Sequence, residues 1–363
     1  MSATQGDSPV KLLKGAYGPW LLPFLTVMIF FVTGNYLIWK NVTEAFLAGN
    51  SDGGDLSRLG YIPGSKMYRH NHDDLPLRHL EQENFRHDRP VDVLTLGDSF
   101  SNLGGGGKNR YYQDYIATVN RATVLNVRPF ASLGLLEALV VLCNNGYLDR
   151  VKPRHLLFSS SEKLAVERFG APMDFSKNIP MAELLTYRRS SYDYFQPKIG
   201  FVNLGNVNYL KYRLLYNFSP CAIWSNTYQA KLTRELFSVE NSDILLFYRN
   251  DLKAISYSTD EKMKILNDNL NIISDILARK GITLHFMPCV DKYDLYSDYI
   301  AHNSFPRSTF FEKLRKLPKR YHFIDTKEIL KPAVDRGEKD IFYPDDSHWS
   351  WKASEIVFSS YRF

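Results

Sequence analysis

The stretch VDVLTLGDSFSN, residues 91–102, decides the predicted fold. Its first half, 91–96, is a short apolar run rich in β-branched residues, which predicts a buried strand. Its second half breaks into Gly-Asp-Ser and a polar, glycine-containing loop. A strand that ends in a tight turn with a serine presents a hydroxyl at the edge of an α/β sheet. Ser99 is therefore either a nucleophile or a polar residue of a turn, and the rest of the chain has to decide between the two.

Further strand candidates follow this one at 123–127, 154–159, 282–287 and 321–325, with helical segments between them. The clearest helix is expected over 259–279, where Ser258 and Glu261 match a capping box and apolar residues recur at helical spacing. Alternating strands and helices predict an α/β fold, in which a mostly parallel sheet carries helices on both faces.

The alternation is lost in the segment 165–257, which is rich in Tyr, Asn and Arg. We expect an insertion that covers the carboxyl edge of the sheet. Its aromatic side chains could stack on sugar rings. They could equally be a packed insertion or a docking face for a membrane partner, and the composition alone does not separate these possibilities.

The segment 16–39 contains no charged residue and is long enough to span a bilayer, which takes about 20 apolar residues. Lysines flank it, and Trp20 and Trp39 suit the two membrane interfaces. The positive-inside rule places residues 1–15 in the cytoplasm and the chain after the helix outside it. A cleaved signal peptide and a buried core helix are the alternatives. Residues 40–88 are expected to be a juxtamembrane connector that packs on the edge of the domain formed by 89–363.

The charge and cysteine content narrow the choice of partners and cofactors. The formal net charge is +6, and the basic residues are scattered, which permits an acidic polymer or a membrane surface as partner. No nucleic-acid motif is present, so no nucleic acid is expected. The three cysteines allow one disulfide and one free thiol, and their spacing does not suit a metal site. We expect neither a metal nor a cofactor.

The glycine run NLGGGGKNR, residues 102–110, does not match a phosphate loop. A P-loop needs G-x-x-x-x-G-K-[ST], but Asn102 stands at the first glycine position and Asn109 replaces the Ser or Thr. Glycines allow backbone N–H groups to approach a bound group closely. The N–H groups around Gly104 and Gly105 are therefore candidates for holding an oxyanion beside Ser99.

A nucleophilic serine needs a base, usually a histidine that a carboxylate orients. Among nine histidines, only His348 lies in a stretch that is dense in carboxylates and bounded by a turn, FYPDDSHWSWKASEIV, 342–357. The following residues predict a terminal helix with Ser350 near its N-cap. Loops that enter helices of a parallel sheet gather at its carboxyl edge, where the Ser99 turn also opens. Asp345 and Asp346 both remain candidates for orienting His348.

GDSF after the first strand and DDSHWS near the end resemble the SGNH hydrolase superfamily, and in detail the alginate O-acetylation and DHHW-type proteins. The stretches KPRHLLFSSSEKLAVE, 152–167, and MPCVDKYDLYSDYI, 287–300, resemble further segments of that group. The resemblance implies a three-layer α/β/α domain with a flavodoxin-like sheet. It implies Ser99, His348 and one of the two aspartates as a triad, and Lys163 where the group usually has Arg.

The resemblance has gaps. The Asp-His block follows the serine here, whereas it precedes the serine in the alginate enzymes. The oxyanion glycine expected after the second strand is not obvious, and Ala131 or Gly134 are the candidates. Gly-x-Asn-Asp is replaced by SSSEK after the third strand.

Those proteins are bacterial, are exported, and work beside a membrane-bound O-acyltransferase on polysaccharides. The resemblance therefore implies a single-pass protein of the bacterial inner membrane whose C-terminal domain lies in the periplasm or outside. Its activity would be O-acetyl transfer to a polysaccharide. A carbohydrate esterase with the same triad is one alternative. A non-catalytic scaffold that binds the polysaccharide or the acyltransferase is the other.

Overall fold

The computed structural model describes residues 18–40, 75–82, 90–102, 104–107, 109–187, 204–222 and 225–363, and single positions or short pieces at 54–56, 64–65, 67, 69 and 85. The chain divides into two compact units. The larger unit takes in Ser51–Phe195 and Tyr212–Phe363, and the smaller takes in Met1–Asn50 and Gln196–Lys211.

The larger unit is built on a six-stranded sheet whose strands all run parallel. The spatial order of the strands is β1-β3-β2-β4-β7-β8. Their bounds are β1 Leu80–Glu81, β2 Val93–Leu96, β3 Val124–Val127, β4 His155–Ser161, β7 Thr283–Cys289 and β8 His322–Phe323. Every residue of β2 and β3 is buried, as expected for central strands of a parallel sheet. The predicted α/β class and all five predicted strands are confirmed.

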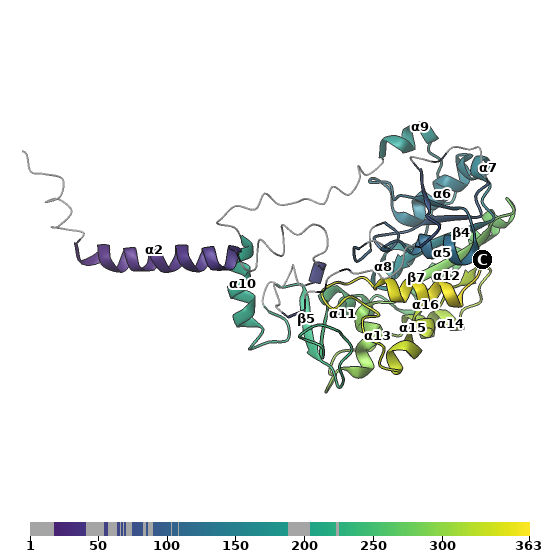
Figure 1. Cartoon of the computed structure of the whole chain (residues 1–363). Coiled ribbons are helices and arrows are strands. Elements are labelled where there is room, and N and C mark those ends of the chain that lie inside the picture. The colour runs from purple at the N-terminus through teal and green to yellow at the C-terminus, as the bar shows by residue number, and fades with distance from the viewer. Residues whose placement is uncertain are drawn as a thin grey trace, which may run out of the picture. The chain divides into compact units, whose positions relative to one another are not determined.

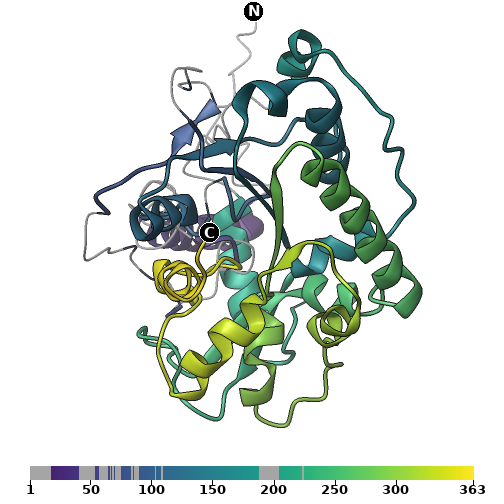
Figure 2. The ribbon, with the colours of Figure 1, turned by 90° about the vertical axis from the view of Figure 1, so that its right-hand side faces the viewer.

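Helices cover both faces of the sheet (Figures 1 and 2). Helices α5, α15 and α16 lie together on one face, and α6, α8 and α12 lie together on the other. The bounds in the larger unit are α5 Tyr112–Asn120, α6 Leu135–Asn144, α7 Tyr147–Val151, α8 Glu162–Phe169, α9 Met181–Leu184, η3 Leu185–Tyr187, α11 Arg249–Ile255, α12 Asp260–Ala278, α13 Lys292–Tyr296, η4 Ser297–Tyr299, α14 Phe310–Lys316, α15 Thr326–Asp335 and α16 Trp351–Ser360.

Helix caps confirm one predicted start and correct another. Ser350 caps α16, because its side chain accepts a hydrogen bond from the Lys352 amide. The cap of α12 is Thr259, whose hydroxyl accepts from the Lys262 amide, and not Ser258. Ser258 and Thr259 both have the hydroxyl that a cap requires, so the sequence left the register open by one residue.

The strand order places the candidate site. Within the sheet, β3 is the neighbour of β2 on one side and β4 is its neighbour on the other side. The segments that follow β3 and β4 therefore diverge on either side of β2 at the carboxyl edge, which is where ligands bind in open α/β sheets. Ser99 lies three residues after the end of β2, directly at this point.

The expected insertion, 165–257, contains a separate pair of antiparallel strands, β5 Thr227–Lys231 and β6 Ile244–Tyr248. Helix α10, Leu204–Leu215, also falls within it. Part of the tyrosine-rich stretch lies outside the described residues. Strand β6 leads directly into α11, and the residues at this junction approach the carboxyl edge of the main sheet, as the hydrogen bond between Lys163 and Asp251 shows.

Helix α2, Gly18–Ile38, is long and apolar enough to cross a membrane, and a signal sequence near an N-terminus would pass the same test. Most of its side chains are exposed, so it is not a buried core helix. The expected cytoplasmic residues 1–15 lie outside the described residues.

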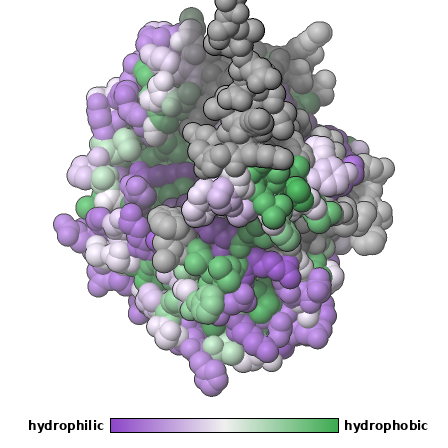
Figure 3. Space-filling view, turned by 90° about the vertical axis from the view of Figure 1, so that its left-hand side faces the viewer, coloured by the Kyte–Doolittle hydropathy of each residue, from purple (hydrophilic) through white to green (hydrophobic). Residues whose placement is uncertain are grey.

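The side chains coloured in Figure 3 mix hydrophilic and hydrophobic residues, which is typical of a globular surface.

The expected connector, 40–88, contributes to the larger unit from Ser51 onward. Leu56 is fully buried, and β1 pairs with β3. This two-residue strand has too little periodicity to be seen in the sequence. The three cysteines, Cys143, Cys221 and Cys289, are free thiols.

Candidate active site

The turn that carries Ser99 is held by close packing and local hydrogen bonds. A Cβ atom at Gly97 would lie 2.0 Å from the Ser159 hydroxyl oxygen and 2.1 Å from that of Ser101, so β4 comes too near for any other residue. The side-chain Nδ2 of Asn102 donates to the backbone carbonyls of Gly97 and Asp98, at 2.8 Å each. Glycine and asparagine of this turn are thus required by its shape.

Asp98, the middle residue of Gly-Asp-Ser, ties the turn to the neighbouring strand. Its Oδ2 accepts from the Ser161 amide at 2.7 Å and from Arg168 Nη1 at 2.8 Å. Its Oδ1 accepts from the Phe100 amide at 3.2 Å. These bonds fix the end of β2 against the end of β4, so Asp98 positions the turn that holds Ser99.

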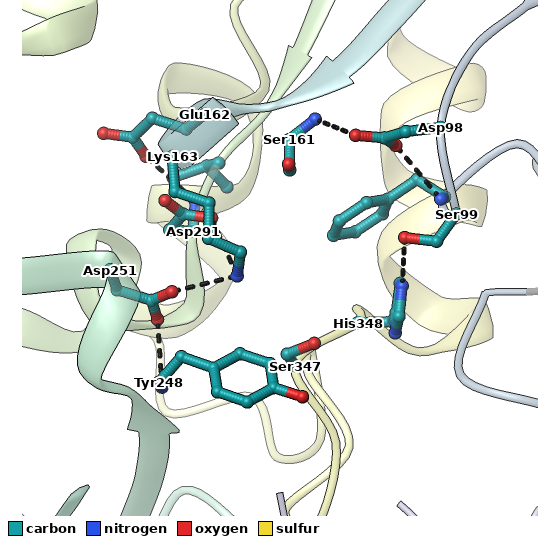
Figure 4. A network of polar contacts seen from close by, with 12 residues as sticks. Asp98, Ser99, Ser161, Glu162, Lys163, Tyr248, Asp251, Asp291, Ser347 and His348 are labelled. Carbon is teal, nitrogen blue, oxygen red and sulfur yellow. Dashed lines mark hydrogen bonds and ion pairs between the residues drawn. The ribbon is translucent and has the colours of Figure 1, made fainter. Parts of the chain in front are cut away.

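His348 lies against Ser99 although 249 residues separate them (Figure 4). Its Nε2 is 2.8 Å from the Ser99 Oγ, and its Nδ1 is 2.7 Å from Asp346 Oδ1. An ionised carboxylate only accepts hydrogen bonds, so Nδ1 carries the proton and Nε2 of the neutral ring accepts from the Ser99 hydroxyl. The three side chains form a connected Ser-His-Asp arrangement.

The ionisation of the Asp-His pair follows from their contact. Burial disfavours the charged imidazolium, but the negative charge and hydrogen bond of Asp346 outweigh this and raise the pKa of His348. Burial acts against ionisation of Asp346 as well, but His348 and then Arg69 hold the pKa of that carboxyl below its usual range. Asp346 is therefore an anion at neutral pH, as orientation of the imidazole requires.

Asp345 has a different role from Asp346, which answers the question that the sequence left open. Its carboxylate is fully buried, forms an ion pair with Arg69 Nη1 at 2.8 Å, and accepts from the backbone amides of Gly54 and Met67, at 3.3 and 3.2 Å. The Leu56 amide donates to its backbone carbonyl at 3.1 Å. Asp345 thus contacts residues between Gly54 and Arg69, while Asp346 contacts His348.

Lys292 holds the loop that precedes His348, at residues 343–346, through hydrogen bonds to its backbone. Its ammonium group is buried and donates to the carbonyls of Tyr343, Pro344 and Asp346, at 2.7, 2.9 and 3.1 Å. Burial lowers its pKa to about 7. The resemblance includes the segment that contains Lys292, but it does not predict these bonds to the loop before His348.

Asp55 and Tyr248 are site residues that the sequence did not reveal. Asp55 accepts from the backbone amide and hydroxyl of Ser347, at 2.8 and 2.7 Å, and its Oδ2 lies 4.0 Å from His348 Nδ1. Burial and then the negative charge of Asp55 raise the pKa of Tyr248, and its ring faces the site (Figure 4). Neither residue belongs to a motif, so only the tertiary contacts identify them.

Asp55, Asp346 and His348 are also close enough to one another to hold a metal ion, with one ligand atom of each within 4.8 Å of the others. Both ring nitrogens of His348 already have partners in Asp346 and Ser99. A metal at Nδ1 would displace the proton that binds Asp346. The distances therefore fit a hydrogen-bonded Asp-His pair better than a metal centre.

The expected oxyanion role of the glycine run is corrected at Gly104. Its amide donates to the Ser99 carbonyl at 2.9 Å, so it has no N–H left for an oxyanion. Its φ of +54° explains why glycine stands there. A Cβ atom at Gly105 would lie 2.4 Å from the Tyr343 ring, so the close packing of this ring explains why glycine stands there. The Gly105 carbonyl accepts a hydrogen bond from Arg69 Nε.

The two candidates after β3 are corrected in the same way. The Ala131 amide donates to the Tyr187 carbonyl at 2.6 Å. The Gly134 amide donates to the Glu137 carboxylate at 3.1 Å, in the cap of α6. Within the part of the chain that the structure describes, the Ser99 amide itself has no protein acceptor. It is therefore a backbone donor available for an oxyanion.

Lys163 lies in the first turn of α8, at the carboxyl edge (Figure 4). Its ammonium is 2.9 Å from Asp251 Oδ1 and 3.5 Å from Asp291 Oδ1, and it lies over the Tyr248 ring at 4.9 Å. Burial opposes its charge, but the two carboxylates outweigh this and raise the pKa of Lys163. Lys163 therefore remains charged, and its charge is balanced by Asp251 and Asp291, so it is not available to bind an anionic substrate group.

A pocket of about 250 Å³ opens beside Ser99. Its walls are Asp98, Ser99, Pro129, Phe130, Leu133, Gly134, Leu135, Ala138 and Arg168. Gly134 lines the pocket and Ala131 does not. The segment after β3 contributes apolar walls to the pocket through Pro129, Phe130 and Leu133.

Comparison with protein-family models finds no match to this chain, and comparison with curated proteins finds none either. Function is therefore argued from the geometry and chemistry of the site.

Proposed function

We propose that this protein is a membrane-anchored, extracytoplasmic SGNH-like serine acyltransferase that moves an acyl group onto polysaccharide hydroxyls through an acyl-enzyme on Ser99. The observation that carries the proposal is the unbroken chain from Ser99 Oγ to His348 Nε2 at 2.8 Å and from His348 Nδ1 to Asp346 at 2.7 Å. Serine, base and orienting carboxylate in this sequence of contacts are what nucleophilic catalysis requires. The resemblance of GDSF and DDSHWS to SGNH proteins agrees with it.

The reaction has two halves. His348 takes the Ser99 proton while Oγ bonds to the carbonyl carbon of the donor, and His348 then protonates the departing group as its bond to carbon breaks. The acceptor hydroxyl next gives its proton to His348 and attacks the acyl carbon, and His348 returns that proton to Ser99 Oγ as the Oγ–carbon bond breaks. Asp346 keeps the imidazole oriented in both halves, and the Ser99 N–H donates to the oxyanion.

The donor and the location of the reaction follow from the resemblance and from α2. If α2 is an anchor and the larger unit lies outside, acyl-CoA is on the other side of the membrane. A membrane-bound O-acyltransferase would then have to hand the acyl group across. The acceptor would be a polysaccharide of the bacterial envelope.

The direct test is labelling of the full chain in detergent with a fluorophosphonate, followed by mass spectrometry. An adduct on Ser99 is expected, and it should be absent from Ser99→Ala. Ser176→Ala, which removes an exposed serine outside the site, is the matched control and should label normally. No adduct in folded protein would reject the nucleophile and leave the scaffold as the better explanation.

A second measurement separates transfer from hydrolysis. The labelled acyl group of p-nitrophenyl acetate is followed with and without an oligosaccharide acceptor. Acyl-oligosaccharide as the main product supports the transferase. Free acetate at the same rate in both reactions would instead indicate the esterase, which uses the same triad on water.

A further inference from the structure

The pocket beside Ser99 has a defined position relative to the two reacting side chains. Ser99 lines it, whereas His348 does not. The oxygen that leaves the donor, and later the acceptor oxygen, must lie at His348 Nε2 because they exchange a proton with it. The remaining substituent of the carbonyl carbon has to point elsewhere, and the pocket is the space that Ser99 opens onto.

Six of the nine residues that line this pocket are apolar, and Asp98, Ser99 and Arg168 make about half of its exposed lining polar. Phe130, Leu133, Leu135 and Ala138 come from the segment after β3 and the first turn of α6. The charged residues are Asp98 and Arg168, whose side chains pair at 2.8 Å and so leave no uncompensated charge. Because its charges are paired and one wall is apolar, the pocket suits an uncharged group whose chain lies against Phe130, Leu133 and Leu135.

Its size exceeds what an acetyl group fills. A volume of about 250 Å³ corresponds to about eight water molecules at liquid density. The methyl group of an acetyl chain would leave most of that volume to solvent, whereas a chain of about six carbons would occupy it. Each additional methylene removed from water improves binding about fourfold.

We propose that the pocket beside Ser99 holds the acyl substituent of the donor, and that this acyl group is an uncharged chain of about four to six carbons. The inference rests on the proposed acyl-enzyme at Ser99, and it replaces the acetyl group that the resemblance implies. In the acylation step the Ser99 Oγ–carbon bond forms, the ester C–O bond breaks, and the Ser99 proton passes through His348 to the leaving oxygen. The chain stays in the pocket until the acceptor attacks.

The test is the chain-length dependence of acylation in the full-length protein. The values of kcat/KM for p-nitrophenyl acetate, butyrate and hexanoate are each divided by the rate of hydroxide-catalysed hydrolysis of the same ester. The corrected value is expected to rise about fifteenfold from acetate to butyrate and further to hexanoate. A corrected value that is highest for acetate would overturn the inference.

A pocket variant ties the preference to this space. Gly134 has a φ of −61°, and a Cβ there would meet its nearest atom, on Glu137, at 3.9 Å, so larger residues fit without strain. Gly134→Leu should lower the hexanoate-to-acetate ratio at least tenfold, and Ser176→Ala, an exposed serine outside the site, should leave it unchanged. The ratio does not depend on the fraction of folded enzyme. An unchanged ratio in Gly134→Leu would also contradict the proposal.

The outcomes separate this inference from the function beneath it. Failure of every ester and of the fluorophosphonate to label Ser99 rejects the nucleophile itself. Labelling of Ser99 with a preference for acetate keeps the acyltransferase and rejects only the longer chain.

Discussion

The two halves of the candidate site are held in different ways. The Ser99 turn is held by its own sequence and the adjoining strand, through Gly97, Asn102 and the bonds of Asp98 to the end of β4. The His348 loop is supported by Lys292 and depends also on Asp55, which is 292 positions from its partner Ser347. The serine is thus held by its turn and the neighbouring strand, whereas the histidine also depends on a segment from the opposite end of the chain, and mutations should separate the two.

The largest difference is expected between the two aspartates of one loop. Asp346→Asn keeps the shape but gives His348 an uncharged partner, and the rate of ester turnover should fall about 10⁴-fold with little loss of stability. Asp345→Asn weakens the buried contact with Arg69 and should act mainly on stability. Steady-state rates and urea unfolding measure both. A larger rate loss in Asp345→Asn would reverse the assignment.

The next effect concerns the support of the His348 loop. Lys292→Met leaves three buried carbonyls without their donor and should cost about 3 kcal/mol of unfolding free energy as well as most of the activity. Urea unfolding gives the first value and fluorophosphonate labelling the second. Lys264→Met, an exposed lysine on α12, is the control. Normal labelling of Lys292→Met would show that the loop does not depend on it.

The Ser99 half should be most sensitive at Gly97. Gly97→Ala forces a methyl group against the hydroxyls of Ser159 and Ser101 and should destabilise the fold by about 2 to 3 kcal/mol. Adding Ser159→Ala removes one of the two clashes and should restore part of the stability. The measurement is thermal or urea unfolding of both variants. No recovery in the double variant would mean that the clash with Ser159 is not the cause.

The smallest effect is a shift of the pH profile. His348 must be neutral to act as base, so activity should rise with pH through its pKa, which lies above the usual 6.5. The negative charge of Asp55 contributes to that raised pKa. Asp55→Asn should therefore move the acidic limb of the kcat/KM profile toward lower pH. Asp174→Asn, an exposed residue far from His348 in sequence, should leave the limb unchanged, and a shift to higher pH in Asp55→Asn would contradict the prediction.

Sequence patterns predicted the local half of this molecule better than the distant half. The apolar run before Gly97 and the alternation of strands with helices were sufficient for the α/β class, because both depend on neighbouring residues. The choice between Asp345 and Asp346 could not be made, because it depends on Arg69 and Gly54, which approach from the other end of the chain.

The oxyanion candidates failed for a related physical reason. Glycine suggests a free backbone amide, but Gly104 and Gly134 both use their amides within their own turns. A residue type indicates which conformations are allowed, and it does not indicate whether a hydrogen bond is already made. Tyr248 was missed because a single tyrosine in an aromatic-rich segment carries no pattern.

The bond between Asp55 and Ser347 joins residues that are 292 positions apart, and this has a consequence for the timing of synthesis. Chains are made at about 5 to 20 residues per second, so about 15 to 60 s separate the appearance of the two residues. The Ser99 turn can form early in that interval, with β3 and β4, while the histidine is still missing. Ser99 and His348 can therefore come together only after the last part of the domain has emerged.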